Sequence, residues 1–132
     1  MTLVDSNVLL DVVTDGQVWG DWSQEQLEQA ALKGQLVIND VIYAEVSTRY
    51  ESLEGIESML MDLQIDVVPI PREALFLAGK AYLQYRAAGG VRTSALPYFF
   101  IGAHAAVERL PLLTRDIRRY RSYFSTVNLI AP

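Results

Sequence analysis

Three acidic residues stand where a carboxylate could take part in chemistry: Asp5, Glu45 and Asp116. Asp5 directly follows the apolar residues 3–4, and Asp116 follows the apolar residues 112–113 with two residues between. Glu45 lies inside an otherwise apolar helical segment. Clustered carboxylates repel one another and raise each other's pKa, so a cluster persists mainly where a divalent cation lies among them. Oxygen ligands of this kind would favour Mg²⁺ or Mn²⁺.

Each acid also has a purely structural interpretation. Asp5 and Asp116 both precede an expected helix, and aspartate is a favoured N-cap residue. Glu45 could extend from its helix into solvent. Taken one at a time these interpretations compete with a functional one, whereas three acids near strand ends together favour a site.

The elements that must position these acids alternate between short apolar strands and helical patterns. Pro71 and Pro97 are expected to open two of the helices, and Asn39 and Ser23 (the latter in a capping box with Gln26) are expected to cap two others. We expect strands at 3–4, 36–38, 66–70, 112–113 and 127–130, and helices at 8–13, 23–34, 40–50, 53–63, 71–86, 97–108 and 116–120. This alternation predicts an α/β fold, with a central parallel sheet of about five short strands and helices on both faces. Ligands in such folds bind beyond the carboxyl ends of the strands.

Length and composition bound the possibilities. The chain has 132 residues, of which 51% are hydrophobic and 20% charged, which predicts one domain over 1–132. It has no cysteine, which excludes disulfides, thiolate metal sites and a cysteine nucleophile. Its one histidine, His104, excludes a poly-histidine metal site and is expected to be a core or dimer-contact residue. With no long apolar run and no basic start, we expect no membrane association and a cytoplasmic location.

Charge is distributed unevenly along the chain. Residues 1–66 carry 13 acidic and two basic residues, a net charge of −11, whereas residues 67–132 carry three acidic and nine basic residues, a net charge of +6. The basic half could provide a face for a polyanion. The alternative is that these charges are solvated helix faces.

Four segments resemble the PIN-domain ribonucleases, and most closely the VapC toxin branch of bacterial toxin–antitoxin pairs. They are Leu3–Asp11, Ile38–Glu45, Leu96–Ala105 and Leu112–Asp116, and they occur in the family's order over essentially the whole chain. The resemblance implies a PIN-like domain and a Mg²⁺- or Mn²⁺-dependent endoribonuclease that cleaves RNA, with tRNA as the expected substrate, and so inhibits translation. It also implies a homodimer neutralised by a VapB-type antitoxin.

The family pattern places four acids around the metal. By position, the resemblance assigns Asp5, Glu45 and Asp116 as the first, second and fourth acids and metal ligands. The third should be an aspartate, and this sequence has Tyr98 there. A phenol is neutral at pH 7 and larger than a carboxylate, so we expect impaired activity. The alternative is an inactive toxin scaffold that acts by binding its antitoxin.

Further residues follow from the resemblance. A polar group that orients the acids and the attacking water would comprise Ser6, Asn7 and Thr114, although helix capping and strand-end bonding are alternatives. A basic group that could contact the RNA backbone, or simply form a solvated helix face, comprises Arg115, Arg118, Arg119 and Arg121.

Two other enzyme classes are disfavoured. A haloacid-dehalogenase-type phosphatase requires a second aspartate two residues after the first, where this chain has Asn7. A phospho-receiver domain requires an acidic pair after the first strand and a late lysine. The only lysines, Lys33 and Lys80, are not in that place.

Overall fold

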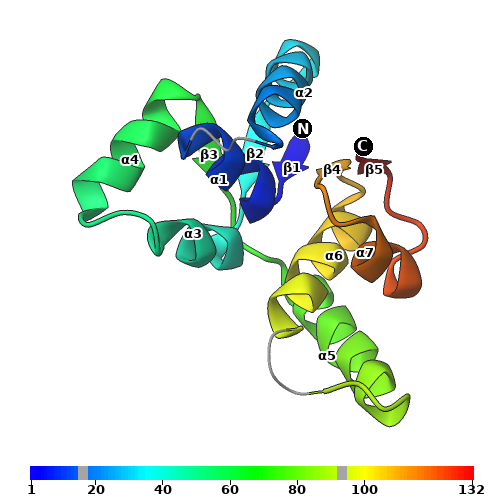
Figure 1. The fold of residues 1–132 in the computed structure, drawn as a ribbon. Helices are drawn as coiled ribbons and strands as arrows, with labels where there is room; N and C mark the ends of the chain where they lie inside the picture. The colour runs from blue at the N-terminus through cyan, green and yellow to red at the C-terminus, as the bar shows by residue number, and fades with distance from the viewer. Residues whose placement is uncertain (15–17, 92–94) are drawn as a thin grey trace.

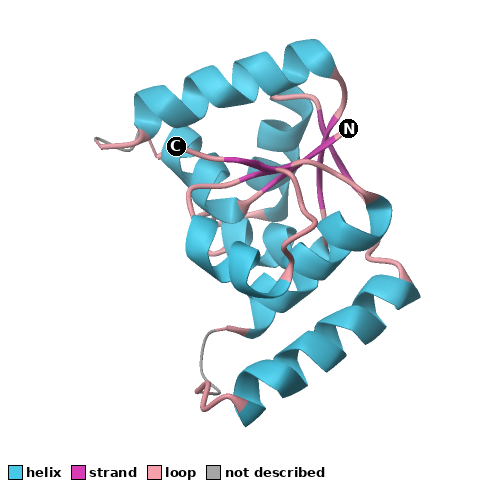
Figure 2. Cartoon of the chain, turned by 90° about the vertical axis from the view of Figure 1, so that its right-hand side faces the viewer, coloured by secondary structure: helices cyan, strands magenta, loops and turns pink. Residues whose placement is uncertain are grey.

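A five-stranded parallel sheet with helices above and below it organises the protein (Figures 1 and 2). The computed structural model describes residues 1–14, 18–91 and 95–132. The strands are β1 (Thr2–Val4), β2 (Leu36–Ile38), β3 (Ile65–Val67), β4 (Leu112–Leu113) and β5 (Leu129–Ile130). The helices are α1 (Ser6–Val13), α2 (Gly20–Lys33), α3 (Asp40–Ser47), α4 (Leu53–Asp62), α5 (Arg72–Ala87), α6 (Leu96–Glu108) and α7 (Ile117–Tyr123). The predicted α/β fold class is confirmed.

The strand order places the first strand at the centre. The sheet runs β3-β2-β1-β4-β5, and each neighbouring pair is parallel. Strands β2 and β3 therefore extend the sheet in one direction from β1, and β4 and β5 extend it in the other. The direction in which successive strands are added to the sheet therefore reverses between β1 and β4. In parallel sheets, ligands bind in the crevice that forms at such a point, at the carboxyl ends of the strands.

The three inner strands are completely buried, as a sheet covered by helices on both faces requires. Every residue of β1, β2 and β4 is buried. The core that they form with the helices consists of aliphatic side chains with a few aromatic ones, among them Phe99 and Tyr120. Only the edge strands β3 and β5 include exposed or half-buried residues.

Helices α5 and α6 form a long antiparallel arm beside the sheet. Figure 1 shows α5 lying beyond α6, on the side away from the strands. Pro71 is the N-cap residue of α5, and a proline stands in the first turn of α6, as predicted. No helix within the described ranges is both long and apolar enough to cross a membrane.

The predicted helix caps are correct at one position and wrong at another. Asn39 caps α3, accepting a hydrogen bond from the backbone N–H of Ile42 at 3.0 Å. The capping box predicted at Ser23 is wrong, because α2 already begins at Gly20 and Ser23 lies inside it, fully buried. Its hydroxyl instead donates to Asp11 on α1 at 2.7 Å. A tertiary hydrogen bond therefore occupies the side chain that was expected to cap the helix.

Replacing a glycine by alanine should have opposite effects on stability in two of the helices. In α6, a Cβ added at Gly102 would lie 2.3 Å from the ring of Phe124, so the two side chains cannot coexist without movement. In α5, a Cβ at Gly79 would meet nothing within 4 Å. We expect Gly79→Ala to stabilise by up to about 1 kcal/mol through helix propensity. Gly102→Ala should destabilise, because overpacking costs about 1–3 kcal/mol and exceeds that gain.

Urea denaturation of the two variants beside the parent protein measures both effects. Since the same glycine-to-alanine change is made in each helix, the difference between the variants isolates the contact with Phe124. Equal stabilisation by both substitutions would show that the ring moves aside at no cost.

Candidate active site

Asp5 connects the end of β1 to two distant parts of the chain. It is 2% exposed, and its Oδ1 accepts a hydrogen bond from the backbone N–H of Ser6 at 2.7 Å, so that it caps α1. Its Oδ2 accepts from the Thr114 hydroxyl at 2.8 Å and from the Tyr120 hydroxyl at 2.7 Å. Asp5 is thus both the N-cap that the sequence allowed and the centre of a buried polar network.

Glu45 is brought to Asp5 by way of Ser6. The Ser6 hydroxyl lies 3.0 Å from Oε1 of Glu45 and 3.4 Å from Oδ1 of Asp5. Since one hydroxyl has one proton, it donates to one carboxylate at a time. Helix α3, which Asn39 caps, presents Glu45 to this end of β1.

Burial and like charge raise the pKa of both carboxyl groups. For Asp5 the main cause is desolvation, to which repulsion from Asp116 adds, and the bonds from Tyr120 and Thr114 oppose it. For Glu45 the main cause is again desolvation, with repulsion from Asp5 in addition. Neither acid forms an ion pair with a cation within the described residues. The site therefore holds negative charge that the described side chains leave uncompensated.

Asp116 lies at the edge of this group. Its backbone N–H donates to the Thr114 hydroxyl at 3.0 Å, and its carboxylate lies 4.0 Å from Nε of Arg119. It precedes α7 but makes no side-chain capping bond, so the capping interpretation of Asp116 has no support in the hydrogen bonds. Among the described residues, no three acidic or histidine side chains are close enough together to hold a metal ion. Asp5, Glu45 and Asp116 are thus neighbours rather than one three-carboxylate cluster.

Tyr98 closes the space beside the acids. It lines a small cavity of about 40 Å³ together with Asp5, Ser6 and Glu45. The Arg119 guanidinium lies over its ring at 4.3 Å, and the Tyr120 ring lies 5.6 Å away between centroids. Desolvation and the negative charge of Asp116 raise the pKa of Tyr98 to about 12, so its hydroxyl is neutral at pH 7.

Asn7 and Thr114 extend the hydrogen-bond network around Asp5. The Asn7 amide Nδ2 donates to the Thr114 hydroxyl at 3.2 Å and lies 3.4 Å from Oδ2 of Asp5. Its Oδ1 accepts from the backbone N–H of Arg115 at 3.1 Å. These bonds hold the loop after β4 against the start of α1.

The four arginines expected to contact RNA have different environments. Arg115 donates twice to Asp11, from Nε at 2.7 Å and from Nη2 at 3.0 Å, so it anchors α1. Arg118, Arg119 and Arg121 lie exposed on α7, the helix that follows Asp116, and Arg119 lies closest to that carboxylate among the described contacts.

Tyr120 was not recognised from the sequence as part of the site, and the bonds of Asp11 and the contact between Asn39 and His104 were not predicted either. Tyr120 comes four residues after Asp116, which places it one turn along α7, but nothing in the sequence says that its hydroxyl reaches Asp5. His104 is buried on α6, as expected, and its Nδ1 lies 3.1 Å from Nδ2 of Asn39. Because the Asn39 oxygen caps α3, its amide nitrogen is the donor and the ring of His104 accepts.

The donor set fits a divalent cation held by two carboxylates. Asp5 and Glu45 supply oxygen ligands of the kind that Mg²⁺ and Mn²⁺ prefer, and Mg²⁺ is commonly held by one or two carboxylates with water completing its shell. The cavity between them exceeds the roughly 10–15 Å³ that one water molecule needs. A cation here would also offset the repulsion between the acids, which adds to desolvation in raising the pKa of Asp5 and of Glu45.

Comparison with known proteins identifies the fold. The PIN domain profile matches residues 2–124, and the chain belongs to the PIN domain family. No curated protein matches the sequence significantly.

Solved structures of the same fold come from several bacteria. VapBC2 from Rickettsia felis, bound to a DNA fragment from its promoter, is 16% identical with a TM-score of 0.74 over 99% of this chain and 98% of that chain. VapBC from Salmonella typhimurium, also DNA-bound, is 13% identical with a TM-score of 0.71 over 99% and 98%. FitAcB from Neisseria gonorrhoeae is 15% identical with a TM-score of 0.68 over 98% and 96%. At these identities the likeness establishes a shared fold.

The raised pKa of Glu45 predicts how stability depends on pH. A carboxyl whose pKa is higher in the folded state binds more protons there, so the protein loses stability as the pH rises from the ordinary value of 4.5 through the raised value. Glu45→Gln keeps the acceptor for Ser6 and removes the charge. We therefore expect this variant, in EDTA, to be more stable than the parent at pH 8 and equal to it below pH 4.5.

Thermal denaturation from pH 4 to 8 measures this difference, with Glu51→Gln as the control because it makes the same change at an exposed position. Parallel curves for the parent protein and Glu45→Gln would contradict the prediction.

His104 makes a second prediction, with the opposite pH dependence. Burial lowers the pKa of His104, so its contribution is complete above the ordinary value of 6.5 and is lost as the pH falls through the lowered value. Glu108, whose charge raises this pKa, opposes the shift. His104→Leu leaves the buried amide of Asn39 unpaired, which should cost about 1–3 kcal/mol at pH 7.5 and less at pH 5.5.

Urea denaturation of His104→Leu, Asn39→Ala and the double variant tests this contact. The double variant should lose less stability than the two single losses together, because both remove the same bond. Additive losses that do not change with pH would contradict the interpretation.

Proposed function

We propose that this protein is the toxin of a type II toxin–antitoxin pair and has the site of a Mg²⁺- or Mn²⁺-dependent endoribonuclease, with activity impaired at Tyr98. The observation that carries this proposal is the pairing of the buried carboxyl group of Asp5 with the half-buried one of Glu45 beside a small cavity, with no cation paired to either within the described residues, at the carboxyl end of the central strand of a PIN fold. Buried charge of this kind is costly unless a cation accompanies it.

The chain's own residues divide the work of binding and orientation. Asp5 and Glu45 would hold the cation, with Asp116 contributing negative charge from the edge of the site. Ser6, Asn7 and Thr114 fix the carboxylates through the bonds described above. When bound, a divalent cation would lower the pKa of a coordinated water and offset charge on the phosphate.

The substrate would be RNA, and tRNA is the class that we propose. The exposed arginines of α7, Arg118, Arg119 and Arg121, lie on the element that follows Asp116. They could neutralise phosphates of an RNA strand, since arginine binds phosphate through several donors at once. Arg115 is not assigned to RNA in this proposal because both of its observed bonds go to Asp11.

Tyr98 is the reason for proposing impaired activity. Its side chain borders the acid cavity at the position where the family pattern expects a third acid, and it brings no negative charge there. The ring also occupies space between Arg119 and Tyr120. An aspartate at this position would supply a further carboxylate and leave room for the metal and the phosphate.

A VapB-type antitoxin is the proposed protein partner, and a homodimer in the cytoplasm is the proposed state, with 1–132 acting as one PIN domain. The similar solved structures from Rickettsia felis and Salmonella typhimurium are VapBC assemblies, which supports the proposed antitoxin partner. Basic side chains of an antitoxin would be attracted to the acids around Asp5.

A second candidate is a catalytically inactive scaffold that acts by binding its antitoxin. The observation that favours it is the saturation of Asp5 Oδ2 by Thr114 and Tyr120, together with the closure of the cavity by Tyr98. In this case the acids would serve as an electrostatic contact for a basic partner rather than as metal ligands.

The substitution Tyr98→Asp distinguishes the two candidates. We expect it to bind Mn²⁺ at least tenfold more tightly than the parent protein in calorimetry, because a third carboxylate joins the site. It should also cleave total tRNA in the presence of Mn²⁺ but not in EDTA. Tyr98→Phe is the matched control, since it keeps the ring and adds no charge, and should behave as the parent.

Unchanged metal binding in Tyr98→Asp would show that position 98 lies outside the metal shell. Improved metal binding without cleavage of any RNA would favour the scaffold. Equal cleavage by the parent protein and Tyr98→Asp would show that Tyr98 does not impair the activity.

A further inference from the structure

We propose that a second cavity, between α5, α6 and α7, binds one unpaired base of a single-stranded RNA. This inference rests on the proposed nuclease function and names how that site would hold its substrate. The cavity has a volume of about 320 Å³, at the lower end of the range of about 300–1,000 Å³ for small-ligand pockets. It is separate from the cavity beside the acids.

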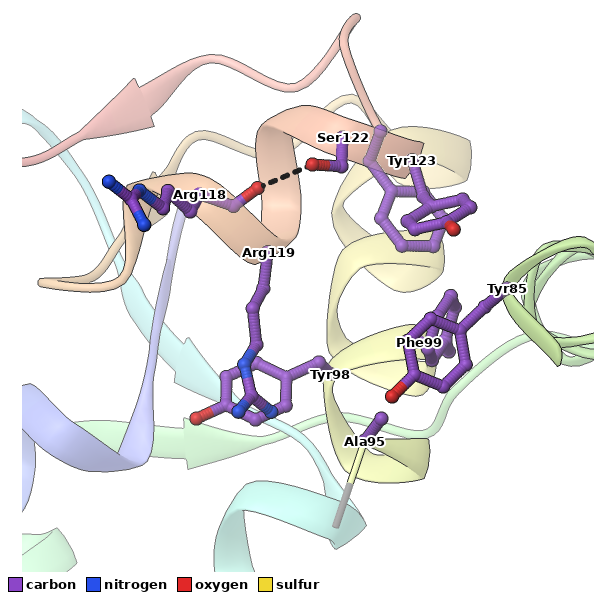
Figure 3. A pocket seen from close by; sticks show the side chains of 9 residues that line it. Tyr85, Ala95, Tyr98, Phe99, Arg118, Arg119, Ser122 and Tyr123 are labelled. Carbon is purple, nitrogen blue, oxygen red and sulfur yellow. Dashed lines mark hydrogen bonds between the residues drawn. The ribbon is translucent and has the colours of Figure 1, made fainter. Parts of the chain in front are cut away.

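Aromatic rings from all three helices line this cavity (Figure 3). Tyr85 of α5, Phe99 of α6 and Tyr123 of α7 form a cluster with centroids 5.3–6.1 Å apart, and Tyr98 forms part of the wall nearer to the acids. Phe99 is buried, whereas the other three rings are half-buried. A cluster of this kind could be ordinary core packing, but here it borders an open space. Flat aromatic walls suit a nucleobase, because any of the four bases can stack on such rings.

The Tyr85 hydroxyl points into the cavity, toward the side where Tyr98 lies (Figure 3). Within residues 1–14, 18–91 and 95–132, neither this hydroxyl nor that of Tyr123 has a hydrogen-bonding partner. A phenol at this place can donate to or accept from the edge of a base. The cavity therefore offers a polar group as well as stacking surface.

The backbone holds Tyr85 in this position before any ligand binds. The N–H of Gly90 donates to the Tyr85 carbonyl at 2.9 Å, and a Cβ at Gly90 would lie only 2.5 Å from the Tyr85 ring. Only a glycine allows the chain to pass so close. A ring fixed in this way loses little freedom when a base stacks against it.

Charge at the cavity suits the phosphates on either side of a bound base. The Arg119 guanidinium lies over the Tyr98 ring, at the border between the cavity and the acids. Arg118 lines the cavity with its backbone and directs its guanidinium away from it (Figure 3). One exposed cation, that of Arg119, thus borders an aromatic cavity, and single-strand binding proteins combine positive charge with aromatic stacking surface in this way.

Tyr98 forms part of the lining of both cavities. It lines the small cavity with Asp5 and Glu45, and it also lines the aromatic cavity with Tyr85. A strand with one base in the aromatic cavity would therefore place a neighbouring phosphate at the acids. Base capture would fix the position of the strand relative to the cleavage site.

Fluorescence anisotropy with two labelled RNA hexamers, in EDTA, tests the inference. One is hexa-adenylate, and the other is an abasic hexamer with the same sugars and phosphates. We expect hexa-adenylate to bind at least about fivefold more tightly, which is the lower end of the effect of stacking one base on aromatic side chains. Tyr85→Leu should remove this preference and leave binding of the abasic hexamer unchanged.

Tyr50→Leu is the matched control, since it removes another half-buried tyrosine, outside this cavity. Should Tyr85→Leu fail to fold, ring resonances of Tyr85 in the parent protein supply the measurement. Hexa-adenylate should shift them and the abasic hexamer should not.

Two results would overturn the inference: equal binding of the two hexamers, and a base preference that survives Tyr85→Leu in folded protein. Failure here is distinct from failure of the proposed nuclease. If Tyr98→Asp cleaves RNA but the parent protein shows no preference for hexa-adenylate, only the base cavity is rejected. If the parent protein prefers hexa-adenylate but Tyr98→Asp cleaves no RNA, only the nuclease function is rejected.

Discussion

The carboxylate of Asp5 is the group on which the arrangement of the site depends. It is buried at the end of the central strand, and its three short hydrogen bonds come from Ser6, Thr114 and Tyr120. These partners belong to the start of α1, the loop after β4 and helix α7. One side chain therefore fixes the relative positions of three elements, two of which are more than a hundred residues away in sequence.

These hydrogen bonds do not fully offset the cost of burying the charged form of Asp5. Three donors reach Asp5, yet its pKa is still raised, because desolvation outweighs the hydrogen bonds. Glu45 shares the same cause, and both acids lie in the half of the chain with net charge −11. Basic residues of the other half lie on α7 and just before it, but Arg119 stacks on Tyr98 and Arg115 binds Asp11. The cations are thus near the acids without neutralising Asp5 or Glu45.

Much of the fold could be predicted because the signals are local. Short apolar runs gave the strands, and Asn39 gave the start of α3. The arrangement of the site was harder to predict from the sequence. That Asp5 and Glu45 come together follows from strand ends meeting at one edge of a parallel sheet. Tyr120 could not be found in this way, because its hydroxyl reaches Asp5 only through the packing of α7 across the loop after β4. The same limit explains Ser23, whose bond to Asp11 depends on how α1 and α2 meet.

The pairing of β1 with β4 has a consequence for biosynthesis. Strand β1 is made before the other four strands but occupies the middle of the sheet, and one of its two neighbours, β4, is the fourth strand to be made. Thr114 and Tyr120, which bind Asp5, are 109 and 115 residues downstream of it. During translation the hydrogen bonds around Asp5 therefore cannot be completed until Thr114 and Tyr120 have left the ribosome. A fragment that ends before these residues lacks two of the three short hydrogen bonds that hold the carboxylate of Asp5.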